Sequence, residues 1–75
     1  IAPNPASNSF TIYSAKETIC NLSIVNNLGS VVQTRPNIKL GKETSIDISN
    51  LSSGIYSVVL RTTQGTSTIK LIVEK

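Results

Sequence analysis

Several residue types that carry protein chemistry are missing from this 75-residue chain or nearly so. It has no histidine and no methionine, and Cys20 is its one cysteine. Zinc sites are built mainly from Cys and His side chains, so almost no ligands of that kind are present. A nucleophile paired with a histidine base is excluded for the same reason, and one cysteine cannot form an internal disulfide. These absences argue against an enzyme and predict no metal or other cofactor.

Long apolar runs and clustered charges are absent as well. No apolar run approaches the roughly 18–20 residues that a membrane-spanning helix needs. The chain has seven Lys and Arg residues against four Asp and Glu residues, a net charge of +3, but the basic residues are scattered along the chain. Nucleic-acid binding uses clustered basic residues, often with interleaved aromatic rings. We therefore expect no transmembrane segment and no nucleic-acid partner.

The length corresponds to one domain, and the chain lacks Met and begins with Ile1. We therefore expect it to be a piece of a longer protein. Pro3 and Pro5 fix their own φ angles and push the preceding residues toward extended conformations. We interpret residues 1–8 as a linker that leads into the domain, and residues 9–75 as the domain itself.

Apolar and polar residues alternate along most of the chain, and no stretch shows the 3.6-residue period of a helix. Strands are predicted over residues 9–14, 18–26, 30–34, 44–49, 55–63 and 66–74. Residues 35–43 are ambiguous, because Pro36 argues against a central strand whereas Ile38 and Leu40 alternate as in a short edge strand. Six or seven short strands separated by turns predict an all-β fold, namely a small antiparallel β-sandwich.

Residues 46–60 contain the clearest strand–turn–strand pattern in the sequence. A polar cluster that ends at Gly54 separates two alternating stretches, and the second one places Tyr56 on its apolar face. Leu51-x-x-Gly54-x-Tyr56 has the layout of a tyrosine corner, in which a Tyr entering a strand bonds back to the main chain. The alternative is a core aromatic whose hydroxyl lies at the rim. Both interpretations give Tyr56 a structural role, and the first favours an immunoglobulin-like sandwich.

The remaining reactive residue types have structural explanations. Cys20 lies mid-strand among apolar residues, which predicts a buried and inert thiol. Asp47 is expected to hydrogen-bond the turn that follows it. Nothing in the spacing of the carboxylates indicates a glycosidase-like pair, and we expect surface positions for Glu17, Glu43, Asp47 and Glu74.

Several short features occur in a fixed order and together resemble a known family. They are Pro3-Asn4-Pro5, a turn at Gly29, the corner with Leu51, Gly54 and Tyr56, a turn at Gly65, and a last strand with basic residues that ends at Lys75. This ordered set, from Pro3 to Lys75, is similar to the C-terminal sorting domain, type A, of cargo proteins of the type IX secretion system (Por secretion system) of Bacteroidetes-type bacteria.

The resemblance implies an immunoglobulin-like sandwich that serves as a folded export signal for a cargo domain upstream in the same chain. The implied partners are an outer-membrane translocon, a cargo shuttle and a surface sortase that removes the domain and joins the cargo to anionic lipopolysaccharide. The implied location is the periplasm in transit, then the cell surface or the medium. The family's recognition segment corresponds to Lys70, Leu71, Ile72, Val73 and Lys75, where exposed edges and a basic tail offer strand addition and charge for docking. Glu74 departs from the basic or neutral residue expected there.

A second hypothesis is a passive fibronectin-like spacer or a carbohydrate-binding accessory module of an extracellular enzyme. Carbohydrate sites usually present exposed aromatic rings, and Tyr13 is the one candidate here. Further domains encoded after Lys75 would favour the spacer, whereas a stop codon there would favour the sorting domain.

Overall fold

A computed structural model describes residues 7–14 and 17–75 of the chain. The described residues form six strands and no helix, which confirms the predicted all-β fold. The strands are β1 (Ser9–Ile12), β2 (Thr18–Asn26), β3 (Val31–Leu40), β4 (Thr44–Asp47), β5 (Gly54–Thr62) and β6 (Gly65–Val73).

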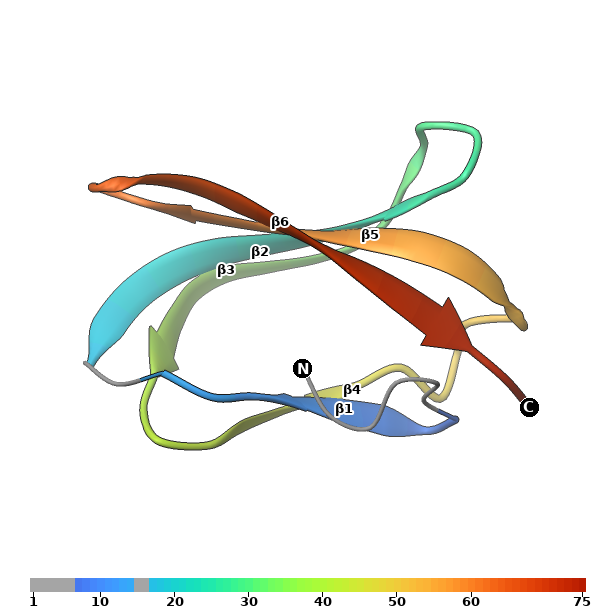
Figure 1. Ribbon diagram of the computed structural model, residues 1–75, viewed down its shortest axis with the longest axis horizontal. Helices are drawn as coiled ribbons and strands as arrows, with labels where there is room; N and C mark the ends of the chain where they lie inside the picture. The colour runs from blue at the N-terminus through green and yellow to red at the C-terminus, as the bar shows by residue number, and fades with distance from the viewer. Residues whose placement is uncertain (1–6, 15–16) are drawn as a thin grey trace.

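The strands form two antiparallel sheets that face each other (Figure 1). One sheet has the order β3-β2-β5-β6, and the other pairs β1 with β4. In an immunoglobulin-like sandwich the corresponding sheets contain strands C′, C, F and G, and strands B and E. By this correspondence β5 is strand F, the strand in which a tyrosine corner is found. The predicted immunoglobulin-like sandwich is confirmed.

The core lies between the two sheets and is built from the apolar face of each strand. On β2, Cys20 is 2% exposed whereas its neighbour Ile19 is 63% exposed, as the two-residue period of a strand requires. Among the described residues no polar or charged side chain is buried. The buried residues are Phe10, Ile12, Cys20, Leu22, Ile24, Leu40, Ile46, Ile48, Leu51, Tyr56, Val58, Leu60, Leu71 and Val73.

Strand β3 is longer than the predicted strand over residues 30–34, and it continues through Pro36 to Leu40. The edge-strand alternative for Ile38 and Leu40 is therefore confirmed, as a continuation of β3. Proline is tolerated because β3 is the outer strand of its sheet and pairs with β2 alone in the described residues. The register moves from Cys20 opposite Ile38 to Leu22 opposite Arg35, so β3 holds one extra residue in this interval. Asn37 lies there with φ +54°, and its N–H donates to Asn21 Oδ1 at 3.0 Å. This extra residue is a β-bulge, which lets β3 remain paired with β2 on both sides of Pro36.

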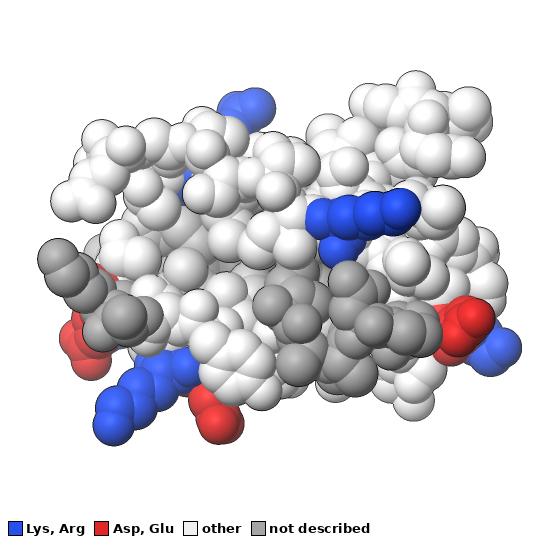
Figure 2. Space-filling model, viewed as in Figure 1, with Lys and Arg blue, Asp and Glu red and all other residues white. Residues whose placement is uncertain are grey.

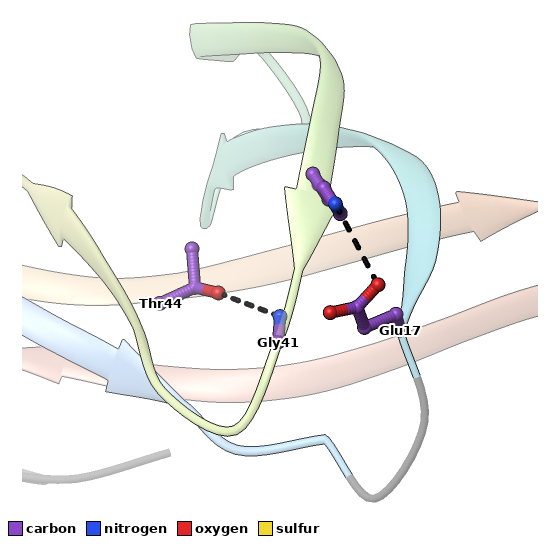
Figure 3. A network of polar contacts seen from close by, with 4 residues as sticks. Glu17, Gly41 and Thr44 are labelled. Carbon is purple, nitrogen blue, oxygen red and sulfur yellow. Dashed lines mark hydrogen bonds and ion pairs between the residues drawn. The ribbon is translucent and has the colours of Figure 1, made fainter.

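Two polar contacts hold the end of β3 (Figure 3). The amide of Gly41 donates to Thr44 Oγ1 at 3.3 Å, which closes the turn into β4. Lys39 Nζ lies 3.5 Å from Glu17 Oε2, but the two side chains are 72% and 74% exposed. An ion pair as exposed as this contributes at most about 1 kcal/mol.

On the face of the molecule drawn in Figure 2, the charged side chains of the described residues do not gather in one place. Figure 2 shows Lys and Arg spread over the visible face, with Asp and Glu at its margins. This distribution agrees with the scattered basic residues in the sequence. It gives this face no continuous basic stripe of the kind that binds nucleic acid.

Candidate functional site

The connection between β4 and β5, residues 48–53, forms a tight corner at one end of the sandwich. Its first turn is closed by the Leu51 amide, which donates to the Ile48 carbonyl at 3.0 Å. The Tyr56 hydroxyl then donates to the Ser52 carbonyl at 2.7 Å, and the Tyr56 side chain is 9% exposed. A buried ring whose hydroxyl bonds to main chain four residues upstream is the geometry of a tyrosine corner.

Asp47 supports the start of this corner. Its Oδ1 accepts a hydrogen bond of 2.9 Å from the Ser49 amide, and its carbonyl accepts one of 3.0 Å from Gln33 Nε2 on β3. The bonds from Ser49 hold the pKa of the Asp47 carboxyl below its usual range, and the charges of Arg35 and Lys75 add to the effect. Asp47 therefore joins the corner to both sheets.

The tail that follows β6 is fastened to the same corner. The Lys75 amide donates to Ser53 Oγ at 3.0 Å. The Lys75 ammonium donates to the carbonyls of Ile48 and Ser49, each at 3.3 Å. In Figure 1 the C-terminal end accordingly lies beside the connection between β4 and β5. We call this set of contacts, made by Lys75 with Ser53, Ile48 and Ser49, the tail latch.

The predicted recognition residues of β6 divide between two environments. Leu71 and Val73 are 0% and 1% exposed and belong to the core. Lys70 is exposed and Ile72 is half-buried, on the opposite face of the strand. In the register with β5, Lys70 lies opposite Ser57, and Ile72 lies opposite Ile55. Lys75 is the one recognition residue that the structure places at the corner.

The predicted motif glycines differ in what their positions require. Gly29 has φ +87° and Gly65 has φ +142°, conformations that L side chains rarely adopt. At Gly54 an added Cβ would lie 3.7 Å from the Tyr56 ring, an ordinary van der Waals contact. Pro3, Asn4 and Pro5, and most of the predicted linker over residues 1–8, lie outside the described residues.

The sequence predicts Ser53 only as a member of the polar turn cluster that ends at Gly54, and it predicts no contact of the tail with Ser53 or with the two carbonyl acceptors of the latch. No sequence signal identifies them, because every residue carries a carbonyl and serines are common in turns. Lys75 lies 22, 26 and 27 residues from Ser53, Ser49 and Ile48, so local spacing does not connect them.

The described residues carry little that could support reaction chemistry. They contain no group of three or more His, Cys, Asp or Glu side chains placed to hold a metal ion. Cys20 is buried, and burial raises the pKa of its thiol, which disfavours the reactive thiolate. In the part of the chain described by the structure, no helix is long and apolar enough to cross a membrane.

Tyr13, the candidate for a carbohydrate platform, is 58% exposed and lines an open groove of about 450 Å³. The groove lies between the end of β1 and the β5–β6 hairpin. Its other lining residues are Ile12, Ser14, Leu40, Leu60, Thr62, Gln64, Gly65, Thr66, Ser67 and Ile69. Tyr13 is the single aromatic ring in this set, and none of the lining residues is charged.

Comparison with known proteins gives a match to a family model. The searches of curated proteins and of solved structures returned no match. The model for the secretion system C-terminal sorting domain matches residues 1–74, which include the corner, the latch residue Ser53 and all of β6. The domains of this family are sorting signals, and the family is not a catalytic one. The match confirms the resemblance seen in the sequence, and the chain belongs to the C-terminal sorting domain family of the type IX secretion system.

Proposed function

We propose that this domain carries the cargo joined to it through the periplasm and across the outer membrane by the type IX route. The observation that supports the proposal most strongly is the family match over residues 1–74. The fold agrees with such a role, because a translocon that handles unrelated cargoes needs one constant shape to bind. A sandwich with a single apolar core and a fastened tail offers that shape whatever precedes it.

The proposed partners are the outer-membrane translocon, a cargo shuttle and a surface sortase. The sortase then removes the domain by cleavage upstream of it and joins the cargo to anionic lipopolysaccharide. Side chains of the recognition segment that reach the surface are Lys70, Ile72 and Lys75, and these are the groups we propose for docking. Leu71 and Val73 act indirectly, because their buried side chains hold β6 in place.

A truncation tests the proposal. Removing residues 70–75 from the parent protein should leave the cargo in the periplasm. The deletion also removes two core side chains, which costs several kcal/mol and unfolds a domain of this size. Lys70→Gln and Lys75→Gln, singly and together, leave the core intact and should reduce surface display without unfolding the domain. Normal surface display of the truncated protein would contradict the proposal.

A further inference from the structure

The tail latch joins two parts of the chain that are distant in sequence. Its acceptors, the Ile48 and Ser49 carbonyls and the Ser53 hydroxyl, come from the corner, and its donors come from Lys75. Residue 75 is exposed, so the latched side chain lies across the surface of the corner rather than inside it. The tail and the corner therefore form one continuous surface.

The corner is held in shape independently of the tail. Ile48 donates its amide to the Asn8 carbonyl at 2.8 Å, and its own carbonyl accepts the Leu51 amide at 3.0 Å. The Ser49 amide is held by Asp47, and the Ser52 carbonyl is held by Tyr56. The two carbonyls that receive the Lys75 ammonium are thus oriented by the folded sandwich. An unfolded chain would not offer them in this arrangement.

The ammonium of Lys75 has three N–H donors, and the latch uses two of them. The third has no hydrogen-bond partner among the described residues, and residue 75 is exposed. A hydrogen-bond acceptor of a partner protein can meet it there, and a carboxylate fits best because it also balances the positive charge.

From these contacts we propose that the sorting machinery binds a composite surface, made of Lys75 and the corner at residues 48–53, through a carboxylate-bearing protein partner. The inference rests on the proposed sorting function and makes it more specific. The bound feature is a conformation of the folded domain and not the tail sequence. A cargo whose sorting domain has not folded lacks the surface and is not bound.

A set of corner variants separates this inference from binding of a linear tail. Each variant is placed in a reporter fused to residues 1–75, and the rate of surface appearance is measured by pulse-chase in a type IX-competent strain. Ser53→Ala keeps the tail sequence but removes one latch acceptor. A typical hydrogen bond changes an affinity about fivefold, so the rate of surface appearance should fall by about that factor. Ser53→Thr keeps a hydroxyl and should restore most of the rate.

Two matched controls accompany these variants. Ser67→Ala changes an exposed serine of β6 that lies outside the corner and outside residues 70–75, so export should be unchanged. Thr62→Ala removes hydrogen bonds of similar strength at the β5–β6 hairpin, far from the corner along β5 (Figure 1). It lowers stability without touching the latch, so it too should leave export unchanged.

The outcomes are distinct. A wild-type fusion that is not exported overturns the proposed function itself. If the wild type is exported and Ser53→Ala keeps its rate, the composite surface is overturned while the sorting function stands. An equal slowing by Thr62→Ala would assign the effect to stability and also overturn the inference. Residues 70–75 attached alone to the reporter should fail to export it, and export of that fusion would show that a linear tail is sufficient.

Discussion

The Tyr56 hydroxyl lies 2.7 Å from the carbonyl oxygen of Ser52, and this hydrogen bond connects the start of β5 to the corner before it. The same ring is 9% exposed and packs in the core between the sheets. One side chain thus fixes both the start of a central strand and the path of the chain that enters it. The corner that receives Lys75 depends on this arrangement.

Tyr56→Phe should lower the free energy of unfolding by about 1 kcal/mol, because it removes one partly buried hydrogen bond and keeps the ring. Tyr56→Ala should cost about 3–5 kcal/mol, since it also leaves a cavity. Urea denaturation followed by circular dichroism measures both. Tyr13→Phe is the control, and its 58% exposed ring should leave stability unchanged. A Tyr56→Phe variant as stable as the wild type would show that the bond contributes nothing.

Gly29→Ala should destabilise the domain by about 1 kcal/mol, because a φ of +87° is costly for a residue with a Cβ. This turn is otherwise well formed, with the Asn26 side chain accepting the amides of Leu28 and Ser30. Gly41→Ala is the matched control: an added Cβ there meets nothing within 4 Å, and φ is not in the left-handed range. Thermal melting compares the two variants, and equal melting temperatures would contradict the account of the turn.

Asp47→Ala should lower the melting temperature at pH 7 by removing the bond to the Ser49 amide. The pKa of Asp47 is lowered in the folded state, so its contribution is fully present above the unfolded pKa near 3.8. The contribution is lost as the pH falls through the folded pKa, which lies lower still. The gap in melting temperature between wild type and variant should therefore begin to narrow below about pH 4 and continue to narrow as the pH falls further. A gap that stays constant down to pH 2 would contradict this origin.

Cys20 should react slowly with a thiol-specific dye in the native domain and rapidly in denaturant. Its side chain is 2% exposed, and burial raises the pKa of the thiol, so both access and thiolate content are low. The labelling rate at several urea concentrations should follow the unfolded fraction. Native labelling as fast as that of a free thiol would place Cys20 outside the core.

Much of the fold could be predicted from the sequence, because five strands carry a clear two-residue alternation. The bounds of β2 agree with the prediction at both ends, and those of β5 and β6 differ by one residue. The second half of β3 could be predicted only as one of two alternatives, a short edge strand at Ile38 and Leu40, since its alternation is broken by Pro36 and by the bulge at Asn37. A bulge depends on the partner strand, and the pairing with Asn21 is not visible locally.

The candidate site, like the fold, could be predicted from the sequence only in part. The spacing of Leu51, Gly54 and Tyr56 was sufficient to suggest a tyrosine corner, because that motif is local. The latch could not be predicted, because its acceptors include the main-chain carbonyls of Ile48 and Ser49, distant from Lys75 in sequence. The burial of Leu71 and Val73 follows from the alternation of β6 and separates structural from accessible residues in the recognition segment.

The most direct test of the central claim is the location of a reporter fused to residues 1–75. The fusion carries a signal peptide for transport into the periplasm and is expressed in a type IX-competent strain and in an isogenic strain without the translocon. Cell fractionation and protease accessibility of intact cells locate the reporter. If residues 1–75 are a sorting domain, the reporter should be at the surface or in the medium of the competent strain. In the strain without the translocon it should stay in the periplasm. A reporter that stays in the periplasm of both strains would contradict it.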